Sequence, residues 1–587
     1  MARRYMTVAV FACALGWLML FVPQAPLSRE VGACEAGAVR DVLAGNVVLP
    51  SYDPDAWLRP PPQYRPGMAR WGEWGPGGMV QVPPLYWWLA AAGARMFGMS
   101  EFALRIPSIL AAAAVSAVLY WWAALAFNRR LALWAATLVM LCKYFVDGGL
   151  SPRMDMLLVL FVTGGSLCLE RAIALGGPGH SSPGRSRMFV GAAVCIALAA
   201  MCKGPIGALL PGLAVAGYLI LRRRWRDLVA PAMLVTFAAG LSVWVLWCAA
   251  AYSVGGRDFF QYQVVEGLLL RFLPNAIGGS SNCRYEPYVY AKVIISQCLP
   301  WSLFLPAFVA LIAERRGSLP EPLIFATCLF VAVFGFFTLS SGRCLVYVLP
   351  CVPPMALMVA YLVTEVSAAP AGLSRTTIAL FYCASVVVAL AGLVSVIVAG
   401  WVTAFGVSAS ILARLHPTDR GLLMMVGGVG LSLWLWMALS SMGVATAIAG
   451  SIRARAGQSA GGVLMVSIAG TFLWFHAIDP TLASRRTLKG FAADVDGVVP
   501  PGVVIQYVGA APPCDLRFYL THRMAIARRP DGPSPFFMLG EDYFGRLRPD
   551  QRAGLQLVAR SQSTGEKLPR LMLMKKSGVG SAGSKSD

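Results

Sequence analysis

Charged side chains at the ends of long apolar runs are the residues of this chain best suited to chemistry. A charge beside the apolar core of a bilayer is costly and needs a compensating role. Lysine and arginine at headgroup depth can hold a lipid phosphate, and a nearby carboxylate can accept the proton of a hydroxyl nucleophile. Together these groups predict group transfer from a lipid-linked phosphate. The set comprises Glu30, Arg105, Asp155, Lys203, Glu266, Arg271 and Arg343.

Three of these residues stand in short motifs. Asp155 follows Arg153 in Ser-Pro-Arg-Met-Asp-Met, at the start of an apolar run. Lys203 ends another run and is followed by a Gly-Pro pair, which predicts a tight turn. Arg343 stands just before a further run. A competing, purely structural interpretation is that such side chains anchor the protein at the membrane interface.

The composition is that of an integral membrane protein. Of the 587 residues, 57% are hydrophobic and 13% are charged, whereas soluble domains have about 25% charged residues. The net charge of +21 is explained by arginine-rich loops facing anionic lipid, so nucleic acid is not an expected partner. About thirteen runs reach the roughly 20 residues that a spanning helix needs. They begin near Met6, Ile106, Leu131, Met154, Met188, Ile206, Leu228, Tyr290, Leu323, Cys344, Thr376, Gly421 and Gly461.

Basic residues recur in alternate loops between these runs. The positive-inside rule places such loops in the cytoplasm. With thirteen spans the N-terminus is then cytoplasmic and the C-terminus extracytoplasmic, and the charged residues of the first paragraph share the outer face. The basic loops contain Arg129 and Arg130, Arg185 and Arg187, Arg222 to Arg226, Arg315 and Arg316, Arg375, and Arg453 and Arg455.

The predicted organisation is a transmembrane domain over residues 1–478, with long external loops at 26–105 and 254–289. Residues 479–577 are expected to form a small extracytoplasmic α+β domain, and 578–587 a disordered tail. Within the first loop, residues 30–43 and 84–97 favour interfacial helices. In the α+β domain, strands are predicted at Val503–Val508, Phe536–Leu539 and Leu571–Met574.

Cysteine and histidine give few signals. Three cysteines, Cys34, Cys283 and Cys514, fall in predicted outer segments, and a disulfide could join two of them. The four histidines have no metal-ligand spacing and no Cys-x-x-Cys occurs, so no cofactor is assigned; a divalent metal would lack a ligand motif.

Short motifs follow one another in a fixed order over residues 25–365. They are Arg29-Glu30 with Arg40 to Asn46, Pro83 to Leu89, Phe97-Gly98, Glu101 to Ser108, Arg153-Met154-Asp155, Lys203-Gly204-Pro205, Leu299-Pro300-Trp301, and Arg343 with Tyr347, Leu349 and Pro350. This order resembles the bacterial members of the protein O-mannosyltransferase and aminoarabinose transferase superfamily, which have the GT-C membrane glycosyltransferase fold.

The resemblance implies a hexosyl- or pentosyltransferase of the bacterial inner membrane. Such enzymes move a sugar from a polyprenyl-phosphate donor to a lipid, glycan or protein acceptor on the extracytoplasmic face, as in lipid A modification or protein mannosylation. Glu30, with Glu35 as the alternative, would be the first-loop base or acceptor-orienting group, and Asp155 the second catalytic carboxylate. Substrate-binding roles are implied for Lys203 and Arg343, which would hold the donor phosphate, and for Arg105, Arg153, Glu266, Arg271 and Tyr347.

Three positions depart from the family pattern. Arg29-Glu30 stands where Asp-Glu is usual, Val82 replaces a lysine before Pro-Pro-Leu, and Cys344 follows Arg343 where Lys-Arg is common. The loss of two cations implies a different donor or weakened activity. The alternative function is therefore a polyprenyl-lipid-binding or transporting protein without transferase activity. A solute transporter is disfavoured, because its usual repeated halves and broken helices are not evident in the sequence.

Overall fold

The computed structural model describes residues 2–22, 27, 34–50, 82–176, 182–261, 264–265, 286, 288–315, 317–340, 342–405, 430–484, 487–509, 512–527, 529–530, 534–561 and 570–576. Two compact units divide the chain. The first comprises Met1–Pro23 and Ala38–Phe475, and the second comprises Gln24–Gly37 and His476–Asp587. Three of the predicted site residues, Glu30, Glu266 and Arg271, lie outside the described residues, as do most of the loop at 254–289 and the tail at 578–587.

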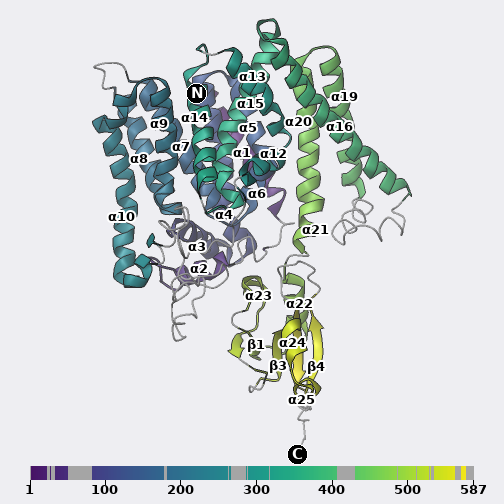
Figure 1. Cartoon of the computed structure of the whole chain (residues 1–587). Helices are drawn as coiled ribbons and strands as arrows, with labels where there is room; N and C mark the ends of the chain where they lie inside the picture. The colour runs from purple at the N-terminus through teal and green to yellow at the C-terminus, as the bar shows by residue number, and fades with distance from the viewer. Residues whose placement is uncertain are drawn as a thin grey trace, which may run out of the picture. The chain divides into compact units, whose positions relative to one another are not determined.

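Long apolar helices make up the first unit (Figure 1). Within the described residues, nine helices are long and apolar enough to cross a membrane, or eleven if each of two bent pairs is one span. Two further predicted runs also contain helices, α1 and α9. Each predicted run therefore contains a described helix, and the number of thirteen spans stays a prediction.

The helices of this unit, in chain order, are α1 (Ala2–Met19), α3 (Leu85–Phe97), α4 (Glu101–Ala126), α5 (Arg129–Met140), α6 (Lys143–Leu150), α7 (Asp155–Ala174), α8 (Pro183–Lys203), α9 (Ile206–Leu221), η4 (Trp225–Val229), α10 (Pro231–Phe259), α12 (Val289–Gln297), η6 (Trp301–Phe304), α13 (Leu305–Glu314), α14 (Glu321–Leu339), η7 (Leu345–Cys351), α15 (Val352–Ala368), η8 (Pro370–Gly372), α16 (Arg375–Phe405), α19 (Gly430–Ile452) and α20 (Ala456–Leu473).

Two of the predicted runs are not single straight helices. The axes of α5 and α6 differ by 63°, and those of α12 and the helix after it by 105°. Pro300 explains the second break, because proline removes a backbone donor and disfavours helix in the residue before it. At the first break the indole of Trp17 donates to the Met140 carbonyl at 3.1 Å, which satisfies a helix-end acceptor.

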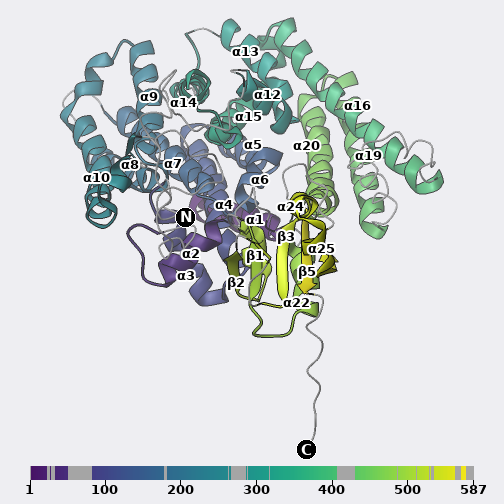
Figure 2. The same cartoon turned by 60° about the horizontal axis from the view of Figure 1, so that its bottom comes forward.

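The arrangement of the bundle places the most enclosed helix at its centre. In the 18-residue apolar stretch of the span Leu345–Ala368, 94% of the residues are buried, whereas the corresponding share in α10 is 22%. Figures 1 and 2 both show α8, α9 and α10 on one side of the bundle and α16, α19 and α20 on the other. The helices α4, α5, α7 and α15 lie between these two groups.

The predicted helix at 84–97 is confirmed as α3, which packs against the start of α4. The Tyr86 hydroxyl donates to the Leu104 carbonyl at 2.8 Å. A Cβ added to Gly93 would stand 3.0 Å from the Ala103 carbonyl oxygen, so glycine permits this close approach. Ser100 caps α4 by accepting from the Ala103 amide at 3.2 Å, which fixes where α4 begins.

The second unit is a small α+β domain, as the sequence predicts. Its five-stranded sheet has the order β2-β1-β3-β5-β4, in which β1 is parallel to β2 and β3 while β5 is antiparallel to β3 and β4. Figure 2 shows these strands side by side. The short helix η9 (Trp474–Ile478) spans the boundary between the two units. The elements that follow it are α21 (Asp479–Ser484), α22 (Lys489–Val498), β1 (Ile505–Val508), α23 (Cys514–Tyr519), β2 (Met524–Ala527), β3 (Phe536–Gly540), α24 (Glu541–Arg546), α25 (Pro549–Ala553), β4 (Leu555–Arg560) and β5 (Leu571–Lys576).

An N-terminal segment belongs to this second unit. A disulfide joins Cys34 to Cys514, and the Leu27 amide donates to the Tyr519 hydroxyl at 2.7 Å. Two of the three outer cysteines named above are thus bonded. Directly after Cys34 begins α2 (Glu35–Leu43), the described part of the helix predicted at 30–43.

Candidate active site

Asp155 is the first residue of α7, and its carboxylate links two cations. Lys203 Nζ donates to one carboxylate oxygen, and Arg153 Nε donates to the other at 3.0 Å. The residue is only 5% exposed. Its position in the first turn is also favourable for a carboxylate, because the N-terminal end of a helix carries partial positive charge.

Lys203 is held at the tip of a tight hairpin between α8 and α9. Gly204 has φ of +71°, a left-handed conformation that favours glycine, and it caps α8. A Cβ on Gly207 would stand 2.3 Å from the Ala199 carbonyl carbon, so the two helices meet almost backbone to backbone. The ammonium lies 4.4 Å from the centroid of the Tyr347 ring, a cation–π distance. The position of Lys203 is therefore set by α8, by α9 and by Tyr347 of η7.

The start of α4 holds the loop that carries Arg153. Arg105 is 3% exposed, and its Nε donates to the Leu150 carbonyl at 2.9 Å. One turn along, the Ser108 hydroxyl donates to the Arg153 carbonyl at 2.9 Å. Buried guanidinium donors need acceptors of this kind. These contacts support a positioning role for Arg105.

The segment before α15 brings Arg343 and Tyr347 to the same end of the bundle. The Cys344 amide donates to the Tyr290 hydroxyl at 3.1 Å. The Phe337 ring packs 6.4 Å from that of Tyr290 and 5.1 Å from that of Tyr347, centroid to centroid. Arg343 Nη2 donates to the Thr338 carbonyl at 3.4 Å, the long end of the hydrogen-bond range. The structure therefore clusters Arg105, Arg153, Asp155, Lys203 and Tyr347, and it sets Arg343 in the adjoining turn.

Glu35, the alternative to Glu30 as the first-loop carboxylate, lies in the described part of the chain. The residue is 8% exposed and begins α2 directly after the disulfide-bonded Cys34. Its burial is a feature that local amphipathicity does not reveal.

Lys143 is a cation that the sequence analysis missed. It begins α6, forms an ion pair with Asp147 and donates to Gln297 Oε1 at 3.2 Å. Its Nζ also lies 4.3 Å from the centroid of the Trp474 ring. The next residue, Tyr144, donates to the Leu345 carbonyl at the start of η7. Lys143 could have been identified from the sequence, because it interrupts an apolar run just as Lys203 ends one.

The opposite end of the bundle carries ion pairs between basic loops and acidic helix ends. At the far end of α9, Arg222 Nε donates to Glu321 Oε2 at 2.9 Å. Arg315 Nη1 lies 2.7 Å from Glu365 Oε2. Since Lys203 immediately precedes α9 and Arg222 follows it, the two charged groups lie at opposite ends of the same helix. This separation matches the alternation of basic loops in the sequence.

Comparison with known proteins gives matches at the level of family and fold. The family described as dolichyl-phosphate-mannose-protein mannosyltransferase matches residues 81–247. The structure of ArnT from Cupriavidus metallidurans bound to undecaprenyl phosphate superposes with a TM-score of 0.69 and 17% sequence identity, covering 96% of this chain and 97% of that one. The chain shares the fold of that ArnT structure. With its long apolar helices, it is a multi-pass membrane protein.

Curated relatives match part of this chain. The undecaprenyl phosphate-alpha-4-amino-4-deoxy-L-arabinose arabinosyl transferase 1 of Proteus mirabilis is 26% identical over 294 residues, 49% of this chain and 50% of that relative. The transferase of the same description from Pseudomonas aeruginosa is 25% identical over 288 residues, again 49% and 50%. The chain thus spans about half the length of the curated relatives it matches.

Proposed function

We propose that this protein is a membrane glycosyltransferase that moves a sugar from a polyprenyl-phosphate donor to an acceptor on the extracytoplasmic face. The observation that carries the proposal is the Asp155 carboxylate bridged to Lys203 and Arg153 at one end of the helix bundle. The structural interpretation, interfacial anchoring, requires no such convergence. Anchors are expected to snorkel separately toward water, whereas Asp155, Lys203 and Arg105 are mostly buried.

The proposed chemistry is a single displacement at the sugar. The acceptor hydroxyl oxygen bonds to the anomeric carbon, and the bond from that carbon to the phosphate oxygen breaks. The electron pair of the broken bond stays on the phosphate oxygen, and a carboxylate takes the acceptor proton. Lys203 and Arg343 stabilise the charge that develops on the leaving phosphate. Asp155 and Glu30 are the two proposed carboxylates, with Glu35 as the alternative for Glu30.

Before the donor binds, the Asp155 carboxylate is paired with the Lys203 ammonium. We expect the donor phosphate to compete for the ammonium, which leaves Asp155 held by Arg153 and directed at the acceptor. Tyr347 keeps the ammonium in place during this exchange, because the ring contact does not use a hydrogen bond of Lys203. Glu266 and Arg271 complete the pocket in this proposal.

The donor is proposed to be an undecaprenyl phosphate that carries an amino pentose. The curated relatives from Proteus mirabilis and Pseudomonas aeruginosa are described as acting on such a lipid, and the ArnT structure is described as bound to undecaprenyl phosphate. The acceptor is a lipid, glycan or protein of the cell envelope. The site lies on the outer face, with the N-terminus cytoplasmic and the domain at 479–577 extracytoplasmic.

Mass spectrometry of lipid that co-purifies with the protein tests this donor assignment. The expected result is undecaprenyl phosphate with a single attached sugar, retained by the wild type and lost from Lys203→Gln. Arg187→Gln, an exposed arginine of a basic loop at the opposite end, is the matched control and should retain the lipid. A preparation that retains phospholipid only, with no polyprenyl species even after its addition, would contradict the assignment.

A further inference from the structure

A groove lies between α5 and α20, at the end of the bundle opposite the Asp155 cluster. Its volume is about 480 Å³. Since α4 has 26 residues, it is about 39 Å long, and it separates Arg105 near one end from Arg129 just beyond the other. The groove is therefore distinct from the candidate active site. It is lined by Arg129, Arg130, Leu133, Trp134, Thr137 and Leu464, which we call the arginine groove.

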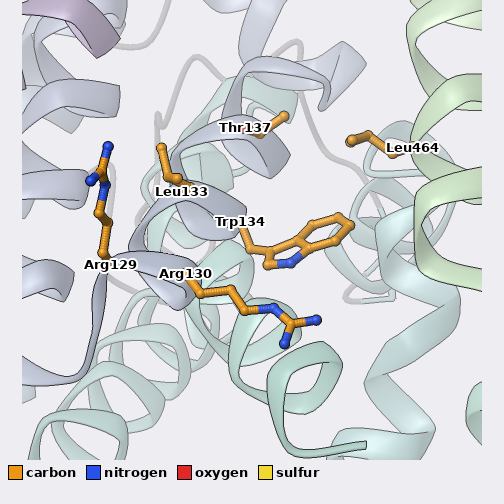
Figure 3. A pocket seen from close by; sticks show the side chains of 6 residues that line it. All are labelled: Arg129, Arg130, Leu133, Trp134, Thr137 and Leu464. Atoms are coloured by element: carbon orange, nitrogen blue, oxygen red, sulfur yellow. The ribbon is translucent and has the colours of Figure 1, made fainter. Parts of the chain in front are cut away.

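The lining combines a cationic head with an apolar body. Arg130, Trp134 and Thr137 follow helical spacing along one face of α5, and Leu464 faces them from α20. Figure 3 shows Trp134 extending toward Leu464, Arg130 extending from the same side of α5, and Arg129 pointing in a different direction from the helix start. Both arginines are exposed, and so is Leu133. The order from head to body matches the order from headgroup to acyl chain in a bilayer leaflet.

The two arginines differ from Arg222 and Arg315 in how their charge is compensated. Arg222 and Arg315 each pair with a glutamate at this end of the bundle. In the part of the chain that the structure describes, no carboxylate pairs with Arg129 or Arg130. Arg129 donates to the weak acceptor Met6 Sδ at 3.9 Å, and an Nη atom of Arg130 lies 3.4 Å from where a Gly457 Cβ would stand. Two guanidinium groups that pair with no carboxylate of the described residues, beside an apolar groove, are suited to bind an anion that has an apolar tail.

We propose that the arginine groove is a binding site for an anionic membrane phospholipid, with its phosphodiester on Arg129 and Arg130 and an acyl chain against Leu133, Trp134 and Leu464. Guanidinium groups suit phosphate, because they offer several donors in a planar fork. Basic pockets between spanning helices are recurrent sites for anionic headgroups. The occupant is a structural lipid of the leaflet that faces the basic loops, not the donor, because the donor phosphate is assigned to Lys203 at the other end.

Native mass spectrometry of the full-length protein tests the proposal. The purified protein is titrated separately with dioleoylphosphatidylglycerol and with dioleoylphosphatidylcholine as the uncharged-headgroup control. The wild type should bind one phosphatidylglycerol molecule at least tenfold more tightly than phosphatidylcholine. In the double variant R129Q/R130Q that affinity should fall roughly thirtyfold, since each basic residue near the membrane surface contributes about fivefold.

Three further variants keep the test decisive. R187Q/R226Q removes the same amount of charge from exposed positions at the same end and should change the affinity less than threefold. Leu464→Trp fills the groove but keeps both arginines, so it should also weaken binding, which guards against misfolding of the arginine variant. Lys203→Gln should leave the affinity unchanged.

Four results would overturn the proposal. They are equal affinity for the two lipids, equal loss in R187Q/R226Q, loss in Lys203→Gln but not in R129Q/R130Q, and a dimer in the wild type that R129Q/R130Q dissociates without changing lipid binding. The third result would move the anionic lipid to the candidate active site, and the fourth would make the groove an interface between two copies.

Discussion

At the scale of residues, the Asp155–Lys203 ion pair is, under the proposed function, the resting state that the donor phosphate displaces. An ion pair with both members mostly buried keeps its strength only when its remaining hydrogen-bonding capacity is also used. Arg153 takes the second carboxylate oxygen, and Tyr347 covers the ammonium. The site is therefore preorganised before any substrate arrives.

Replacing Lys203 or Arg343 by glutamine should weaken use of the donor more than use of the acceptor. A charge-assisted contact to phosphate contributes about 1.5–3 kcal/mol, so each change should raise the donor KM or lower turnover by roughly tenfold or more. If both cations hold one phosphate, the double variant should lose less than the sum of the two. Steady-state kinetics with varied donor measures this, and unchanged donor dependence in both single variants would return the two residues to the role of anchors.

In the second unit, a histidine makes stability depend on pH. His522 Nδ1 lies 2.7 Å from Asp496 Oδ1 and Nε2 lies 3.0 Å from the Pro500 carbonyl oxygen, so both nitrogens face acceptors. The hydrogen bond to Asp496 is the main cause that raises the pKa of His522 above its ordinary value of about 6.5. A raised pKa stabilises the folded domain fully below the unfolded pKa, and that stabilisation is lost as pH rises through the folded value.

Hydrogen exchange of the full chain measures this effect. Exchange of β1 amides should accelerate when the pH rises from 6 to 8, after correction for intrinsic rates, and His522→Gln should remove the difference. At pH 8 the same substitution should not slow the exchange of the β1 amides. A pH dependence that persists in His522→Gln would assign it to another group.

At the scale of elements, the α8–α9 hairpin sets the position of Lys203. Gly207→Ala places a Cβ where the Ala199 backbone already lies, so the helices must separate. We expect a loss of about 1–3 kcal/mol in stability and reduced activity. Gly217→Ala is the control, because it lies exposed in the same helix with nothing within 4 Å. Thermal melting in detergent compares them, and equal melting temperatures would show that the hairpin is not tight.

The strands that the sequence predicted are more buried than the strands that it did not predict. Strands β1, β3 and β5 were predicted and form the buried centre of the sheet, so their apolar residues were visible. The two missed strands, β2 and β4, are the sheet edges and are largely exposed. Edge strands carry a weak apolar pattern because one side faces solvent.

The site was predictable in part for a related reason. Asp155, Lys203 and Arg153 stand at run ends, where a charge is conspicuous. Their pairing, and the contacts of Lys143 with Gln297 and Trp474, depend on residues far apart in the chain. The break between α5 and α6 was also hidden, because no proline or glycine marks it.

At the scale of the whole molecule, the orientation N-terminus inside and C-terminus outside is the prediction on which the external site depends. Disulfides persist in oxidising compartments, and the Cys34–Cys514 bond supports an extracytoplasmic second unit. An alkaline phosphatase fusion after residue 578 should be active, and a green fluorescent protein fusion there should not fluoresce. Mass tagging of the denatured protein should label two more cysteines after reduction than before. If the green fluorescent protein fusion fluoresces and the alkaline phosphatase fusion is inactive, the C-terminus is cytoplasmic and the predicted orientation is wrong.

The central claim, transfer of a sugar from a polyprenyl-phosphate donor at the Asp155–Lys203 site, is tested most directly by acceptor-dependent release of undecaprenyl phosphate. Purified protein in liposomes is given the undecaprenyl-phosphate-linked amino pentose with and without an envelope lipid extract. The wild type should release the free carrier only when acceptor is present. Asp155→Asn should be slower by roughly 10²–10⁴-fold at unchanged expression and melting temperature, while Arg187→Gln matches the wild type. Wild-type protein that binds the donor without releasing it, or Asp155→Asn with near-full activity, would contradict the account.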